Sequence, residues 1–106
     1  MTPITLATLH QVIVGAVRSD APDLSQRQLA VLLDAARQPE PRTVRGLAAA
    51  LNVSKPAITR ALDRLEELAL ARRLPDPKDR RSLLVGVTRA GREYLARLVS
   101  PGEVLQ

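Results

Sequence analysis

Cationic side chains gather in one part of this chain, between residues 54 and 92. This segment holds ten lysines and arginines against five acidic residues, whereas residues 1–53 hold five arginines against four acids. Guanidinium and ammonium groups bind phosphate oxygens and the acceptor atoms of nucleic-acid bases. The localised charge therefore indicates either a site for a polyanion or a solvated basic surface that aids solubility.

The densest group of charges is the stretch LPDPKDRR, residues 74–81, which a branched apolar run follows at residues 83–87. The apolar run predicts a strand. We expect residues 71–74 and 83–87 to form a hairpin whose prolines, together with Asp76 and Asp79, make a stiff turn. The cationic side chains of that turn would then project from a rigid tip: Lys78, Arg80 and Arg81.

A second polar group lies on a helix predicted from Ser54 to about Leu70. Apolar residues at i, i+3, i+4 and i+7 spacing predict one buried face, namely Ile58, Ala61, Leu62, Leu65, Leu68 and Ala69. The opposite face carries Lys55, Thr59 and Arg60 near its N-terminus, followed by Asp63 and Arg64. We expect Asp63 to pair with Arg60 or with a hairpin arginine. Taken alone, the pattern also fits an ordinary amphipathic helix.

The remaining elements follow from capping residues and apolar spacing. Thr2 predicts the start of a first helix, which SDAPDL ends. The residues Ser25, Thr43 and Thr88 predict the starts of QRQLAVLLDAAR, VRGLAAAL and RAGREYLARLV, and Pro101-Gly102 the end of the last one. On the second helix we expect one shared apolar face, formed by Leu29, Leu32, Leu33 and Ala36.

The third and fourth predicted helices are joined by only about three residues, which is typical of a helix-turn-helix. Small residues at 48–50 would let the two helices approach closely, and Val53 would fill the space between them. Ser54 would cap the fourth helix. In such motifs the N-terminal end of the second helix enters the major groove of DNA.

Three motifs in order resemble the MarR family of bacterial transcription regulators across residues 24–92. LSQRQLAVLL is similar to the family's Leu-Ser/Thr-x-x-Gln helix opening, and GLAAALNVSKPAITRALDRLEELAL to its helix-turn-helix. RRLPDPKDRRSLLVGVTRAG is similar to its wing followed by a Leu-Thr-x-x-Gly helix start. The resemblance implies a mainly α fold with a small β-hairpin wing (α+β), that is, a winged helix-turn-helix.

The resemblance also implies a homodimer that binds a pseudo-palindromic double-stranded DNA operator, with repression as the expected outcome. Helix 54–70 would enter the major groove, and the wing, residues 71–87, would reach the minor groove. The positions that meet DNA or lie in the wing motif are Ser54, Lys55, Ala57, Thr59, Arg60, Arg64, Asp79, Arg80 and Arg81. In the family a wing aspartate braces an arginine. We add Lys78 as a phosphate contact and expect Arg81 to enter the minor groove.

We expect a single domain over residues 1–106, with a DNA-binding lobe at 24–88 and dimerisation helices at 1–23 and 89–106. Family members are usually longer, and from this sequence we expect no second C-terminal helix. The apolar stripe of the first helix, together with Tyr94, Leu95, Leu98 and Val99, would build a smaller interface. The alternative is a winged-helix adaptor that binds a protein and no specific DNA.

Composition excludes several kinds of function. The chain has no cysteine, one histidine and one aromatic residue, Tyr94. We therefore expect no metal, no cofactor and no thiol-based peroxide sensing. It has neither a nucleophile–histidine arrangement nor a glycine-rich phosphate loop, so we expect no enzyme. A small-molecule or protein effector stays open. No apolar run could span a bilayer and no signal peptide is evident, so we expect a cytoplasmic protein.

Overall fold

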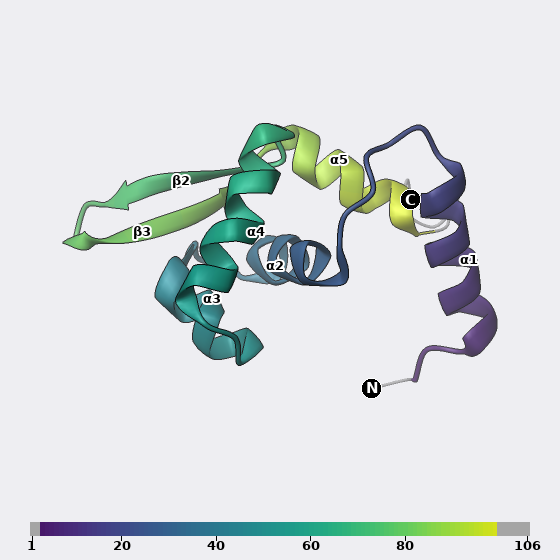
Figure 1. Ribbon diagram of the computed structural model, residues 1–106, viewed down its shortest axis with the longest axis horizontal. Coiled ribbons are helices and arrows are strands. Elements are labelled where there is room, and N and C mark those ends of the chain that lie inside the picture. The colour runs from purple at the N-terminus through teal and green to yellow at the C-terminus, as the bar shows by residue number, and fades with distance from the viewer. Residues whose placement is uncertain (1–2, 100–106) are drawn as a thin grey trace.

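The computed structural model describes residues 3–99 and forms a winged helix (Figure 1). The elements are α1 (Leu6–Arg18), α2 (Gln26–Arg37), β1 (Arg42–Thr43), α3 (Val44–Leu51), α4 (Lys55–Glu67), β2 (Ala71–Asp76), β3 (Asp79–Val87) and α5 (Arg89–Leu98). The β2–β3 hairpin projects from one end of the molecule, and α1 lies at the other end against α5. The predicted mainly α fold with a β-hairpin wing is confirmed.

Serine and threonine side chains fix where the helices begin. The Ser25 hydroxyl accepts a hydrogen bond from the Gln28 backbone N–H, and the Gln28 side chain accepts one from the Ser25 N–H, which completes a capping box. Thr43, Ser54 and Thr88 cap α3, α4 and α5 as predicted.

The predicted start of the first helix at Thr2 is wrong. The helix begins at Leu6, because Thr5 accepts a hydrogen bond from the Thr8 N–H and so satisfies a free amide of the first turn. Thr2 itself lies outside the described residues, as does the predicted stop at Pro101-Gly102. Helix α5 ends at Leu98.

The core is aliphatic and lies between α2, α3, α4 and the base of the hairpin. Its largest fully buried side chains are Val31, Leu32, Leu47, Ile58, Leu62, Leu65 and Val85. The face predicted for the second helix is partly wrong. Val31 and Ala35 are buried beside Leu32, whereas Leu33 is exposed. The buried face of α2 includes Val31 and Ala35 because both α3 and α4 pack on this helix. None of the helices within residues 3–99 is long and apolar enough to cross a bilayer.

The turn of the helix-turn-helix depends on Asn52. Its φ of 54° places it in the left-handed region, which asparagine tolerates, and its N–H caps α3. Val53 is partly buried against the core, as predicted. Of the three alanines predicted to let the helices approach, Ala48 packs on the core, whereas Ala49 and Ala50 are exposed.

Helix α4 ends at Glu67, three residues before the predicted end at Leu70. Ala69 has a φ of 60°, and the Leu70 N–H donates to the Leu65 carbonyl at 2.8 Å. This left-handed residue turns the chain from the helix into β2, where Leu70 and Ala71 are buried. An L-residue other than glycine or asparagine is strained in this conformation.

Replacing Ala69 with glycine is expected to raise the free energy of unfolding by about 0.5–1 kcal/mol, because glycine adopts positive φ without strain. Urea denaturation followed by circular dichroism measures the change. The matched control is Ala49→Gly, an exposed helical position, which is expected to lose about as much stability. If both variants lost stability alike, the proposed strain at Ala69 would be refuted.

The sheet has three antiparallel strands in the order β1–β3–β2. Val85 pairs with Arg42 on one side and with Arg73 on the other. The hairpin strands are longer than the predicted 71–74 and 83–87, because pairing continues to Asp76 and Asp79 at the exposed tip. Strand β1 was not predicted, since two residues give no alternation pattern.

Candidate nucleic-acid interface

The polar face of α4 is presented to solvent. Lys55, Arg60 and Arg64 are exposed, and Thr59 is half-buried beside them. The Arg64 guanidinium pairs with Glu67 at 3.1 Å, one turn along the same helix. Lys55 and Arg60 take part in no salt bridge among the described residues, so their charges face outward uncompensated.

Two residues predicted to contact DNA, Ser54 and Ala57, stabilise the start of α4. The Ser54 hydroxyl accepts a hydrogen bond from the Ala57 N–H at 3.2 Å, so it serves as the N-cap. Ala57 is 7% exposed and belongs to the buried face. Its methyl group therefore packs inward, and a contact of Ala57 with DNA stays a prediction. The methyl group packs inward because of its position beside Ile58, where the helix rests on the core.

Two aspartates shape the hairpin tip by accepting hydrogen bonds from backbone N–H groups. Asp76 accepts from the Lys78 N–H at 2.9 Å, which makes a tight Asx turn. Asp79 accepts from the Arg81 N–H at 3.0 Å and from the Ser82 hydroxyl at 3.2 Å. The family resemblance implies that a wing aspartate braces an arginine. Asp79 contacts Arg81 through the backbone N–H of that residue, and no hydrogen bond joins Asp79 to a guanidinium within residues 3–99.

A hollow of about 100 Å³ lies where α3, α4 and the hairpin meet. It is lined by Thr43, Val44, Arg45, Lys55, Thr59, Arg73, Arg81, Ser82 and Leu83. The fold therefore brings Lys55 and Thr59 of the helix together with Arg81 of the hairpin. Arg60, Arg64, Lys78 and Arg80 are exposed and do not line the hollow.

Arg45 is a cationic residue of this surface that the sequence analysis missed. It is exposed and follows the cap residue Thr43 by two positions, in the first turn of α3. The available signal was its position in the first turn of α3, the first helix of the helix-turn-helix.

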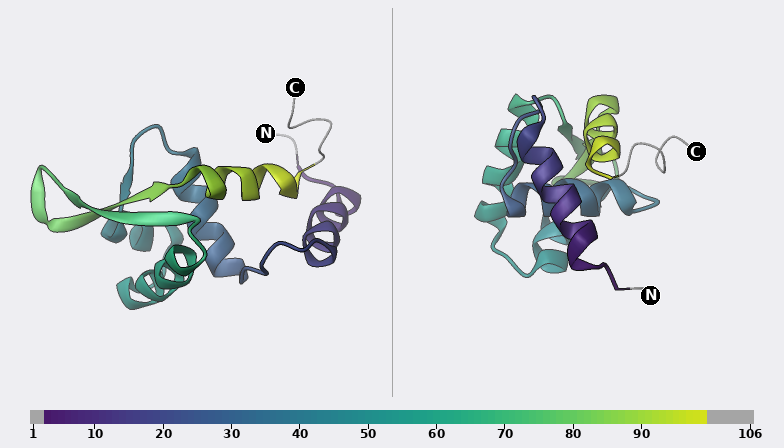
Figure 2. Two further views of the ribbon diagram at one scale, coloured as in Figure 1. Left: turned by 90° about the horizontal axis from the view of Figure 1, so that it is seen from above. Right: turned by 90° about the vertical axis from the view of Figure 1, so that its right-hand side faces the viewer.

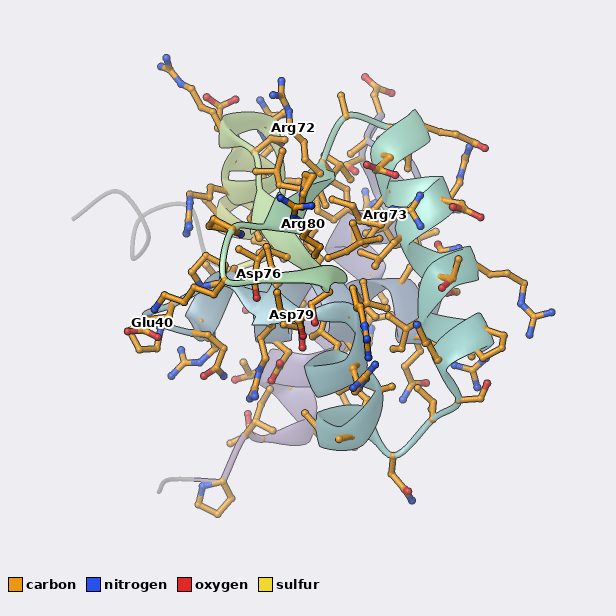
Figure 3. The ribbon with its side chains drawn as sticks, turned by 90° about the vertical axis from the view of Figure 1, so that its left-hand side faces the viewer. Glu40, Arg72, Arg73, Asp76, Asp79 and Arg80 are labelled. Carbon is orange, nitrogen blue, oxygen red and sulfur yellow. The ribbon has the colours of Figure 1, made fainter. Side chains whose placement is uncertain are left out.

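Arg73 of β2 joins the hairpin to α4. Its Nη2 donates to Asp63 Oδ1 at 2.6 Å and also to Glu66, and its Nε donates to Glu66 Oε1 at 2.8 Å. The Arg73 backbone N–H donates to the second oxygen of Glu66 at 3.0 Å. We expected Asp63 to pair with Arg60 or with a hairpin arginine, and it pairs with a hairpin arginine. This arginine, Arg73, lies at the base of the hairpin. In Figure 3 Arg73 points toward α4, whereas Arg72 lies on another side of the ribbon.

These contacts favour the charged forms of Glu66 and Arg73. Hydrogen bonds from the side chain and backbone of Arg73 hold the pKa of Glu66 below its ordinary value, although burial acts the other way. Burial disfavours the charge of Arg73, but hydrogen bonds to Asp63 and Glu66 outweigh it and raise its pKa. Since the pKa of Glu66 is lowered by folding, its contribution to stability is present at neutral pH and is lost as pH falls through that lowered pKa.

The side chain of Tyr94 is buried within the protein, although we expected it to lie on the dimer surface. The side chain is 9% exposed, and its hydroxyl donates to the Pro22 carbonyl at 2.9 Å. Burial, with a smaller contribution from Asp23, raises the pKa of Tyr94. Tyr94 thus ties α5 to the segment between α1 and α2. Leu95 and Leu98 also pack partly against the core, which leaves Val99 exposed.

Helix α1 carries the apolar surface that is left uncovered. It has no buried residue, and Leu6, Ile13 and Val17 are 82%, 47% and 65% exposed. Figure 2 shows α1 standing apart from the helix-turn-helix, beside the end of α5. The exposed apolar residues of α1 therefore form a stripe that the described part of the chain does not cover.

Comparison with solved structures places this geometry among known regulators. MarR is 31% identical to the chain, with a TM-score of 0.65, and the match covers 84% of this chain and 60% of MarR. BldR from Sulfolobus solfataricus is 33% identical with a TM-score of 0.68, over 94% of this chain and 70% of BldR. The transcriptional repressor CouR, bound to a 23-mer DNA duplex, is 27% identical with a TM-score of 0.70, over 93% of this chain and 63% of CouR.

A family model supports the same assignment from the sequence. The model of the MarR family matches residues 23–82, which span α2, the helix-turn-helix and most of the hairpin. No curated protein matches the chain. The chain spans about 60% of the length of MarR. By its family match and its fold, the protein belongs to the MarR family of winged-helix transcriptional regulators.

Proposed function

We propose that the protein is a sequence-specific double-stranded DNA-binding transcriptional regulator that acts as a repressor. Residues 24–88 form its DNA-binding lobe, with α4 in the major groove and the wing, β2–β3, at the adjacent minor groove. One observation carries the proposal. Lys55 and Thr59 of α4 and Arg81 of the wing line one hollow, and Arg60 of α4 and Arg80 of the wing are exposed on the same two elements. The similarity to CouR, which is bound to DNA, supports it.

Each cation has a role that its position suits. Lys55 and Arg60 lie at the N-terminal half of α4, from which long side chains reach guanine acceptors or phosphates. Thr59 suits a thymine methyl group or a phosphate. Arg81 leaves the braced tip and suits a narrow, strongly negative minor groove. The remaining cations, Arg45, Arg64, Lys78 and Arg80, suit phosphates on either side.

We further propose that the protein acts as a homodimer through α1. A second copy would cover the exposed stripe of Leu6, Ile13 and Val17 with the same stripe of its own α1, as two-fold symmetry requires. The operator would then be pseudo-palindromic, with its half-sites separated by about one helical turn.

Selection of bound duplexes from a random DNA library tests the proposal directly. We expect a palindromic motif whose affinity falls steeply with salt concentration, because phosphate contacts release counterions. Failure to retain any duplex at low salt would favour the protein adaptor instead.

Two substitutions separate base contacts from phosphate contacts. Arg60→Ala is expected to cost about 1–3 kcal/mol on the selected operator and to relax the preference at one base pair. Lys78→Ala is expected to weaken all duplexes about equally and to lower the salt slope by about one. Fluorescence anisotropy on the operator and on single-base variants measures both. Unchanged binding of both variants would show that the proposed docking is wrong.

A further inference from the structure

We infer that Arg73 is a positioning residue that sets the angle between the wing and α4, so that the two grooves of the operator are read at one fixed spacing. The inference rests on the proposed function, since it concerns how the same surface discriminates between DNA sequences. Arg73 would contribute to specificity through the wing, without making base contacts of its own.

The geometry of Arg73 fits a brace. Its guanidinium spans Asp63 and Glu66, carboxylates from adjacent turns of α4, so it cannot pivot about either one. Glu66 holds the backbone N–H of Arg73 as well as its side chain. Among residues 3–99, these are the only salt bridges between α4 and the hairpin. They therefore fix both the position and the direction of β2 where it passes the helix.

The place of Arg73 along the hairpin makes this contact mechanically important. Arg73 pairs with the buried Val85 at the base, and the turn lies about four residues further on. At about 3.3 Å per residue, the tip stands roughly 13 Å beyond the brace. A rotation of about 10° at the base would move the tip by roughly 2 Å, a large displacement against a minor groove about 6 Å wide.

Arg73 is poorly suited to contact DNA itself. Its side chain is 20% exposed, and two carboxylates neutralise its charge. Its neighbour Arg72 is exposed and takes part in no salt bridge among the described residues. The two arginines are adjacent and carry the same charge but lie on opposite faces of β2, so Arg72 provides a matched control (Figure 3).

The test uses the full chain and two versions of the operator selected from a random library, identical in the bases facing α4. One has A·T-rich flanks, which narrow the minor groove under the wing, and the other has G·C-rich flanks. A third duplex carries one changed base pair in the part facing α4. The ratio of affinities for the two flanks reports the wing, and the third duplex reports α4.

The wild type is expected to prefer the A·T-rich flanks by about tenfold. In Arg73→Met, and in the double variant Asp63→Asn with Glu66→Gln, this ratio is expected to fall to within about twofold. Discrimination against the changed base pair facing α4 is expected to persist. Arg72→Met should keep the wild-type ratio. Thermal unfolding of each variant shows that the fold is retained.

The double variant separates positioning from simple charge. Removing two negative charges beside the DNA would by electrostatics alone strengthen binding to every duplex and leave the flank ratio unchanged, and that result would overturn the inference. A parallel loss of both kinds of discrimination, or a wild-type flank ratio near one, would overturn it as well. Failure of the proposed function has a different signature, since the wild type would then select no motif at all.

Discussion

Replacing Gly91 with alanine is expected to lower the free energy of unfolding by about 3 kcal/mol, at the upper end of what overpacking costs. A Cβ atom at this position would lie 2.1 Å from the Leu70 carbonyl oxygen and 2.9 Å from Cγ1 of Val87. The carbonyl cannot move away cheaply, because it accepts the Thr88 N–H at 3.1 Å. Urea denaturation followed by circular dichroism measures the loss.

The control for Gly91 is Gly15, whose Cβ would meet nothing within 4 Å. Gly15 lies inside α1, so Gly15→Ala is expected to stabilise the protein by up to about 1 kcal/mol. Equal stability of Gly91→Ala and the wild type would contradict the close approach. The comparison also explains the Thr-x-x-Gly motif physically. Thr88 caps α5 and donates to the Ala69 carbonyl at 2.7 Å, and Gly91 lets α5 lie close to the Leu70 carbonyl, between α4 and β2.

The sequence predicted the helix starts best, because the signal for each is local. Ser25, Thr43 and Thr88 each lie directly before a helical pattern, and each caps the helix there. The helix start predicted at Thr2 was wrong because Thr5 also has a hydroxyl that can cap a helix, and Thr5 is the residue that caps α1. A pattern alone cannot rank two such caps. The predicted end of α4 was wrong for a related reason. The left-handed φ of Ala69 is imposed by tertiary structure and not by its side chain, so the sequence does not show where the helix ends.

Contacts between distant segments were predicted less well. The sequence placed Lys55 and Thr59 on one helix face and Arg81 on a turn, and the family resemblance suggested that they act together. Nothing local identified Arg73, which follows Glu66 by seven residues and meets it only after the chain reverses. Likewise, the apolar spacing of α2 is compatible with either of two adjacent faces being buried. Val31 lies on the buried face because α3 and α4 pack there.

Replacing Ile13 with aspartate is expected to convert the proposed dimer into a folded monomer. Ile13 lies within the exposed stripe of α1, where a second copy would bury it, and a buried carboxylate without a partner is costly. The monomer itself should keep its fold, because α1 contributes no buried residue to the core. Light scattering after size-exclusion chromatography measures the mass, and circular dichroism the fold.

The loss of the dimer should appear in DNA binding more strongly than in stability. Two linked lobes bind two half-sites with an avidity that can exceed that of one lobe by 10²–10⁴. We therefore expect Ile13→Asp to bind the full operator at least about 100-fold more weakly and a single half-site as well as the wild type does. The control Gln11→Asp adds the same charge outside the apolar stripe and should leave both the mass and the affinity unchanged. A wild type that is already monomeric, or an Ile13→Asp variant that stays dimeric, would place the interface elsewhere. Equal losses on the operator and the half-site would instead show that α1 acts on the DNA-binding lobe itself.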